Sequence, residues 1–132
     1  MILGKMTFYF TYTLMYFDFR KNDVLFYLYS TYTLTLSHVV KQLLRPADLL
    51  GRYGGDEFVV LLPATNEHTA VAIANRLLEH INNIQLINGE RLSVSVGITQ
   101  MKQDDDFESL FKRTDKALYE AKRSGRNCIF QH

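Results

Sequence analysis

The chain has 132 residues, of which 47% are hydrophobic, and its 15 basic and 14 acidic side chains leave a formal net charge of +1. This length and apolar content predict one compact domain with a single core, and they exclude a disordered chain, a collagen-like repeat and a pair of full domains. Because the charges nearly balance, the composition points to neither nucleic acid nor an anionic membrane surface as a partner. The single cysteine, Cys128, cannot form an internal disulfide, which suits a reducing cytoplasm.

Two stretches with few charges are candidates for membrane spans, residues 6–17 and residues 24–40. The first is too short to cross a bilayer, and its hydroxyl-bearing side chains make the second too polar for hydrocarbon. The start of the chain also lacks the short apolar core and small-residue cleavage site of a secretory signal. We therefore expect neither a transmembrane helix nor a direct membrane contact.

The first predicted element is a strand over Met6–Tyr16, in which aromatic and apolar residues alternate mainly with threonines, and Asp18 follows at its carboxyl end. Residues 22–35 are compatible with either strand or helix. A helix that starts near Ser37 and ends near Pro46 is predicted next. Its apolar stripe comprises Leu36, Val39, Val40, Leu43, Leu44 and Ala47.

A hairpin is predicted from the apolar stretches 49–53 and 58–62, with a Gly-Gly pair at the turn between them. Thr65 is in a position to cap the following helix. The predicted buried face of that helix comprises Ala70, Ile73, Ala74, Leu77, Leu78 and Ile81. Asn88-Gly89 then predicts a second hairpin turn.

Residues 92–99 alternate strictly between apolar and small or polar residues, which predicts a half-buried strand. The acidic residues 104–106 suit the amino terminus of a last helix, Gly125 ends that helix, and residues 128–130 form a short final strand. The predicted core face of the helix comprises Phe107, Leu110, Phe111, Leu118 and Ala121. The order of elements predicts an α+β fold, with a central, mainly antiparallel or mixed β-sheet flanked by helices.

Composition changes near residue 36, because most of the aromatic residues precede it. We expect residues 1–36 to be a divergent, aromatic and threonine-rich part of the same domain, with its first strand and the following segment. Residues 37–132 then form the domain core.

The tract Arg52-Tyr53-Gly54-Gly55-Asp56-Glu57-Phe58 sets two carboxylates beside two glycines at the tip of a predicted hairpin. Glycines let backbone N–H groups approach phosphate oxygens closely, and carboxylates hold the hard cation that accompanies a polyphosphate. The alternative is a solvated turn in which the acidic residues only keep the hairpin soluble.

Gly54–Phe58 spell the motif of a known family, and the chain resembles the GGDEF domains of bacterial diguanylate cyclases. Arg45-Pro46-Ala47-Asp48 looks like the RxxD inhibitory site of that family, and residues 114–127 resemble its closing signature, in which ALYxAK precedes GRN. The resemblance covers roughly residues 37–130. It implies a nucleotide-cyclase, polymerase-palm-like GGDEF fold.

The resemblance also implies an activity, the condensation of two GTP into cyclic di-GMP with release of two pyrophosphates. A divalent cation, Mg²⁺ or Mn²⁺, would be the cofactor, and a homodimer would bring the two GTP molecules together. The expected partners are GTP and cyclic di-GMP, with no nucleic acid. The expected location is the cytoplasm, as a free domain or as a fragment of a membrane-attached sensor.

By the same resemblance, Gly54 and Gly55 approach the phosphates, Asp56 ligates metal, and Glu57 assists the metal or the proton transfer. These assignments place all of the catalytic chemistry at one hairpin tip. Phe58 is expected to be an anchor in the core.

Lys122 and Arg126 match the family positions that grip the terminal phosphates. The alternative is that they are ordinary cations at a helix end, where they favour the helix dipole in any case.

Asp18 resembles the first metal aspartate of the family, and Asn22 corresponds to its guanine-binding asparagine. The chain also departs from the family pattern: the opening helix, the DxLTGLxNR tract and the GHxxGD tract are absent. The second guanine contact of the family, an aspartate, would fall near Ser30, whose hydroxyl cannot replace a carboxylate that accepts two hydrogen bonds.

These departures leave a second interpretation open, a catalytically impaired domain that acts as a cyclic di-GMP receptor or as a dimerisation module through the RxxD site. Arg45 would present its planar fork to guanine or phosphate acceptors, and Asp48 would accept from guanine N–H groups. The alternative for the same two residues is a simple i,i+3 ion pair at a helix end.

Overall fold

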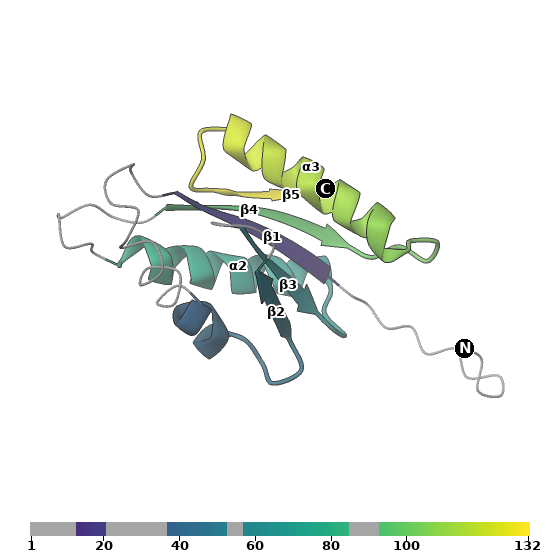
Figure 1. Ribbon diagram of the computed structural model, residues 1–132, viewed down its shortest axis with the longest axis horizontal. Helices are drawn as coiled ribbons and strands as arrows, with labels where there is room; N and C mark the ends of the chain where they lie inside the picture. Colours follow the sequence, from purple (N-terminus) through teal and green to yellow (C-terminus); the bar gives the residue numbers. More distant parts are fainter. Residues whose placement is uncertain (1–12, 21–36, 53–56, 85–92) are drawn as a thin grey trace.

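The computed structural model describes residues 13–20, 37–52, 57–84 and 93–132. Within these ranges five strands form one sheet in the order β2-β3-β1-β4-β5 (Figure 1). β4 and β5 are parallel, whereas the other neighbouring strands are antiparallel, so the predicted mixed sheet flanked by helices is confirmed. The strands are β1 (Thr13–Arg20), β2 (Leu49–Arg52), β3 (Glu57–Leu62), β4 (Ser93–Gln100) and β5 (Ile129–Gln131). The helices are α2 (Glu67–Asn82) and α3 (Phe107–Arg123), and residues 37–43 are also helical.

The central strand β1 runs past the predicted end of the first strand. Asp18 was expected to follow that strand, but it lies within β1, opposite Glu57 of β3 on one side and Ser95 of β4 on the other. Pairing with β3 continues to Asp18 and pairing with β4 continues to Arg20, so neighbouring strands extend β1 beyond its predicted end. The predicted strand start, residues 6–12, lies outside the described residues.

The prediction of a half-buried strand at residues 92–99 is wrong, because β4 is buried on both faces. Its valines and isoleucine at 94, 96 and 98 pack into the core with α2. On the opposite face Ser95 and Thr99 are 2% and 0% exposed. Gly97 lies between them, and a Cβ there would be 2.4 Å from the backbone nitrogen of Leu118, so α3 packs directly on the strand. The sequence pattern suggested that this face of β4 is exposed to solvent. Its residues are instead small enough for α3 to pack on the strand (Figure 1).

The core on the α2 face is formed by residues 37–43, β3, β4 and α2. Its fully buried members are Val40, Phe58, Val60, Leu62, Ala70, Ala74, Leu77, Ile81, Val94, Val96 and Ile98. Phe58 is 2% exposed, which confirms its expected role as an anchor. The helical residues 37–43 end before Pro46, somewhat earlier than predicted, since a proline disfavours helical conformation at the residue before it.

The amino-terminal cap of α2 is Asn66 and not the predicted Thr65. The Asn66 side chain accepts a 2.8 Å hydrogen bond from the backbone N–H of Thr69. Thr65 is buried, 2% exposed, and its hydroxyl oxygen instead accepts a hydrogen bond from Arg45, which lies in the loop before β2. The cap therefore shifts by one residue because a tertiary contact occupies the Thr65 hydroxyl.

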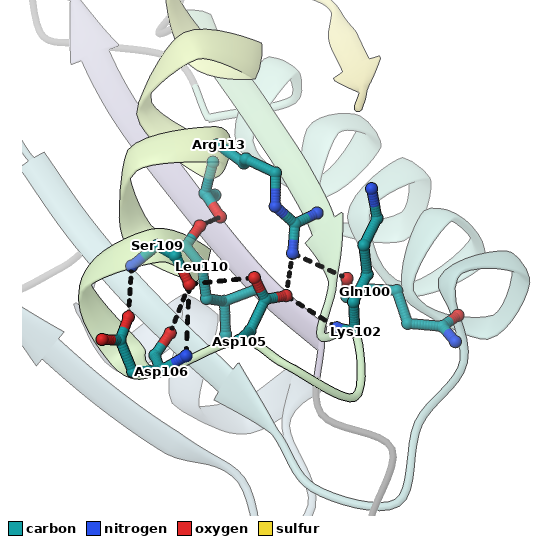
Figure 2. Close-up of polar contacts among 8 residues, drawn as sticks. Gln100, Lys102, Asp105, Asp106, Ser109, Leu110 and Arg113 are labelled. Atoms are coloured by element: carbon teal, nitrogen blue, oxygen red, sulfur yellow. Dashed lines mark hydrogen bonds and ion pairs between the residues drawn. The ribbon is translucent and has the colours of Figure 1, made fainter.

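The amino terminus of α3 is fixed by a polar network (Figure 2). Asp106 and Ser109 form a reciprocal capping box. The neighbouring Asp105 carboxylate accepts from the backbone N–H of Lys102, from the Ser109 hydroxyl and from the Arg113 guanidinium. Burial alone raises the pKa of Asp105, but these hydrogen bonds and the charge of Arg113 outweigh it and lower the pKa below its ordinary value. The network therefore fixes the start of α3 against the end of β4.

Phe107 was predicted to lie in the core, but it is 61% exposed. It stacks on Phe111 at a centroid distance of 6.0 Å, and both rings line an open apolar groove between α3 and the β2–β3 pair. The first turn of α3 thus borders an open groove and leaves Phe107 largely exposed. No helix within the described part of the chain has the length and apolar content needed for a membrane span.

Candidate functional site

Two acidic residues and a serine lie in one row across the three middle strands of the sheet, β3, β1 and β4. Glu57 begins β3 and lies directly opposite Asp18, and Asp18 lies directly opposite Ser95. Residues that face each other across antiparallel strands lie on the same face of the sheet. Because Ser95 and Gly97 belong to the face under α3, the row Glu57–Asp18–Ser95 belongs to that face too.

A cation from α3 lies at the Glu57 end of this row. The Nζ atom of Lys122, in the last turn of α3, lies 4.0 Å from Oε1 of Glu57. The two side chains are 26% and 34% exposed, so the pair is neither buried nor fully solvated. Solvent can therefore reach the start of β3 at the point where acidic and basic groups meet.

The predicted hairpin tip lies between the ends of two described strands. β2 ends at Arg52, β3 begins at Glu57, and Arg52 lies opposite Phe58 in the antiparallel pair. Among the predicted site residues, Gly54, Gly55 and Asp56 lie in this connection, outside the described residues, as does Asn22. The end of the connection at Glu57 lies beside Lys122.

Arg126 lies just beyond α3, two residues after the carboxyl-terminal cap Ser124. Its backbone N–H donates a 3.1 Å hydrogen bond to the carbonyl of Ala121. This bond keeps Arg126 at the same end of the helix as Lys122. Both predicted phosphate-binding cations are therefore close, in sequence and in space, to the last turn of α3.

The residues of the predicted RxxD site are bonded to each other. Oδ1 of Asp48 accepts from Nη2 of Arg45 at 2.8 Å, and Oδ2 accepts from the Arg45 backbone N–H at 2.8 Å. The Asp48 side chain is 0% exposed, whereas 49% of the Arg45 side chain remains accessible. Hydrogen bonding to Asp48 raises the pKa of Arg45 above its ordinary value. The i,i+3 ion pair foreseen as the alternative for this motif is present.

Arg45 also makes contacts that nothing in the local sequence indicated. Its Nη2 atom donates to the carbonyl of Pro63 at 2.9 Å and to Oγ1 of Thr65 at 2.5 Å. Arg45 therefore joins the loop before β2 to the corner between β3 and α2. The sequence could not predict this contact, because the two loops become neighbours only when β2 and β3 pair and bring them to the same end of the hairpin.

The apolar groove beside α3 is separate from the row of acidic residues. It is lined mainly by Leu49, Val59, Leu61, Phe107 and Phe111. Among the residues that the structure describes, no predicted catalytic or metal-binding residue lines it. Apolar side chains form most of its wall, with charged residues such as Arg52 and Lys112 also lining it. The predicted motif residues that the structure describes lie instead at the end of the sheet near Glu57 and Lys122, which is the candidate site.

Glu57 supplies one carboxylate of the kind that could hold a hard divalent cation. Carboxylate oxygens are preferred ligands of Mg²⁺, and Glu57 and Asp18 are adjacent in register. The described residues alone do not gather three or more His, Cys, Asp or Glu side chains in one place. Asp56, which directly precedes Glu57, lies outside those residues.

Comparisons with known proteins identify the family. The family model for the GGDEF domain of diguanylate cyclases matches residues 34–128. Diguanylate cyclase DgcM of Escherichia coli K12 is 37% identical over 94 residues, which cover 71% of this chain and 23% of that protein. Diguanylate cyclase DgcP of Pseudomonas aeruginosa is 43% identical over 93 residues, which cover 68% of this chain and 14% of that protein.

A solved structure shares the fold. The GGDEF domain of YfiN, also called TpbB, from Pseudomonas aeruginosa superposes with a TM-score of 0.80 at 28% identity, over 92% of this chain and 81% of that one. The chain spans about a quarter or less of the length of the curated relatives named above. The family match over most of the chain and the shared fold lead to one conclusion: this chain belongs to the GGDEF domain family.

Proposed function

We propose that the chain is a diguanylate cyclase module that condenses two GTP molecules into cyclic di-GMP and releases two pyrophosphates. The observation that carries the proposal is the position of Glu57, opposite Asp18 in the sheet and 4.0 Å from Lys122 of α3. Acidic metal ligands beside a phosphate-binding cation are what a magnesium nucleotide requires.

In the proposed reaction the ribose 3′ hydroxyl of one GTP releases its proton to solvent and its oxygen forms a bond to the α-phosphorus of the other GTP. The bond from that phosphorus to pyrophosphate breaks. Two such steps close the ring, and a homodimer would present the two GTP molecules to each other. Positioning and charge stabilisation do most of the work in phosphoryl-type transfers. The chain therefore needs groups that orient the phosphates and balance their charge.

The register supports assigning Glu57, together with Asp18, to the metal site. The expectation from the sequence was that Asp18 and Asp56 ligate the metal and that Glu57 assists. Direct pairing of Asp18 with Glu57 supports a larger role for Glu57, with Asp56 next to it on the hairpin connection. A bound Mg²⁺ or Mn²⁺ ion would neutralise charge on the attacking and leaving oxygens.

The remaining roles follow from the same placement. Lys122 and Arg126 would hold the terminal phosphates from the end of α3, and Gly54 and Gly55 would let the backbone approach them. Asn22 would contact the guanine. A reaction that uses GTP fits a cytoplasmic location, as a free domain or as part of a membrane-attached sensor.

The test is incubation of the purified chain with GTP and Mg²⁺, with product identified by chromatography and mass. Cyclic di-GMP is expected, and Asp56→Ala should abolish its formation while the melting temperature stays near that of the wild type. Asp104→Ala, an exposed acid outside the site, is the control and should retain activity. No product at high protein concentration would reject the proposal, and full activity of Asp56→Ala would remove the metal assignment.

The second candidate function is a cyclic di-GMP receptor or dimerisation module that uses Arg45 and Asp48. It is supported by the RxxD motif and by the accessible half of the Arg45 side chain. The Asp48 carboxylate is buried and bonded to the Arg45 guanidinium, so binding through both residues would require their ion pair to break. Calorimetry with cyclic di-GMP decides this candidate: binding unaltered by Arg45→Ala would argue against the site.

A further inference from the structure

Three consecutive residues after α3 have left-handed backbone conformations. The φ angles are 109° at Gly125, 64° at Arg126 and 47° at Asn127. Glycine adopts this region freely and asparagine tolerates it, but an arginine there is strained by its Cβ. The left-handed conformation of Arg126 therefore persists only if the surrounding structure holds it.

One anchor of this turn lies on the helix side. Ser124 caps α3 through a 2.9 Å bond from its N–H to the carbonyl of Glu120, and the Arg126 N–H donates to Ala121 at 3.1 Å. With Gly125 left-handed, the bond from Arg126 to Ala121 is the 6→1 bond of the Schellman arrangement that ends many helices. These contacts fix the chain up to Arg126, but not the direction in which it leaves.

A second anchor lies on the sheet side and is made by a side chain. Oδ1 of Asn127 accepts a 3.4 Å hydrogen bond from the backbone N–H of Val94 in β4. The next N–H that β4 directs to the same side, that of Val96, donates to the carbonyl of Cys128 at 2.9 Å. The Asn127 side chain thus extends the β4–β5 ladder by one hydrogen bond beyond the strand itself.

We infer that Asn127 is a positioning residue that fixes Arg126 between α3 and β4 for contact with the phosphates of GTP. The inference rests on the proposed function for the use of Arg126, but the anchor itself rests on the contacts above. Asparagine suits the position for two independent reasons. It tolerates the left-handed region, and its amide oxygen supplies the acceptor that β4 needs.

Two substitutions separate these reasons. Asn127→Gly keeps the left-handed freedom and removes the acceptor, whereas Asn127→Asp keeps an acceptor on a side chain of the same shape. Ser124→Ala, in the same turn, is the matched control, since only the backbone of Ser124 is used in the cap. Each protein is examined by amide exchange at Val94, by the HN–Hα coupling that reports φ at Arg126, and by steady-state kinetics with GTP.

In Asn127→Gly we expect faster exchange at Val94, loss of the positive φ at Arg126, and a KM for GTP raised about tenfold, as for the loss of one hydrogen bond, with a smaller change in kcat. Asn127→Asp should keep the exchange at Val94 and the φ of Arg126 near those of the wild type, and Ser124→Ala should resemble the wild type in all three measurements. In the Arg126→Ala background, Asn127→Gly should have little further effect on KM, since its effect is exerted through Arg126.

Unchanged exchange at Val94 in Asn127→Gly would overturn the anchor, and fully additive effects of the two substitutions on KM would overturn the positioning role. If the wild type neither binds nor converts GTP, the proposed function fails by itself. The anchor is then judged by the exchange and coupling measurements, which need no nucleotide.

Discussion

Lys122 extends from the last turn of α3 to within 4.0 Å of Glu57, the first residue of β3. The contact links the carboxyl-terminal helix to the strand that follows Gly54-Gly55-Asp56 in the sequence. Glu57 also lies opposite Asp18 of β1 in the sheet. Glu57 is therefore the residue at which β1, β3 and α3 meet.

Lys122→Ala should raise the KM for GTP more than it lowers stability. Both side chains of the pair are partly exposed, so its loss should change the free energy of unfolding by no more than about 1 kcal/mol. The loss of a phosphate-binding cation should raise KM by about tenfold or more. Urea unfolding and steady-state kinetics measure the two effects. Arg123→Ala, the adjacent exposed cation, is the control, and a larger loss of stability than of affinity would make Lys122 a structural cap.

Gly97→Ala should destabilise the fold by about 1–3 kcal/mol or prevent α3 from docking. The new Cβ would lie 2.4 Å from the Leu118 nitrogen and 2.6 Å from the Thr114 carbonyl oxygen, and neither backbone atom can move without displacing α3. Gly51→Ala is the control, because its Cβ would meet only a carbonyl oxygen at 4.0 Å. Chemical denaturation of both variants checks this, and equal stabilities would show that α3 does not pack tightly on β4.

Arg45→Ala should lower the free energy of unfolding by about 1–3 kcal/mol in the absence of any ligand, because it leaves the Asp48 carboxylate without its guanidinium partner. It also removes the bonds that join Arg45 to the corner at Pro63 and Thr65. Denaturation without nucleotide measures the effect, with the exposed Lys41→Ala as control. A wild-type stability would mean that this cluster contributes no net free energy, and would leave Arg45 with a ligand role alone.

The stability of the chain should fall as the pH drops below about 4, the ordinary range of an aspartate carboxyl. Hydrogen bonds from the Ser109 backbone N–H and hydroxyl lower the pKa of Asp106, and the pKa of Asp105 is lowered as well. A carboxyl with a lowered pKa in the folded state contributes stability that is complete above its unfolded pKa and is lost as the pH falls through the folded one.

The measurement is urea unfolding at a series of pH values between about 3 and 7. Asp106→Asn should flatten the acid part of this profile, because the amide oxygen can still accept at the cap but has no proton to take up. Asp104→Asn, in the same loop, should keep the profile of the wild type. A profile that stays steep in Asp106→Asn would mean that this carboxyl does not link the cap to acid unfolding.

The sequence by itself determined the family motif around Glu57, the apolar stripe of α2 and the alternation of β4, since each depends on residues close together in the chain. Only the tertiary structure decided that the second face of β4 is covered. Ser95, Gly97 and Thr99 have the pattern of a solvated face, and local periodicity cannot reveal that a helix later in the chain packs on it. The same limit applied to Phe107, which has the spacing of a core residue but is largely exposed beside an open groove.

The candidate site divides in the same way. Its acidic residues and cations were recognisable from the sequence, because motif residues are fixed by chemistry at short spacing. The adjacency of Asp18 to Glu57 was not, because it depends on the register of a central strand that two neighbours set together. The bonds from Arg45 to Thr65 and from Val94 to Asn127 likewise join parts of the chain that are distant in sequence, and only the packing of sheet and helices brings them within hydrogen-bond distance.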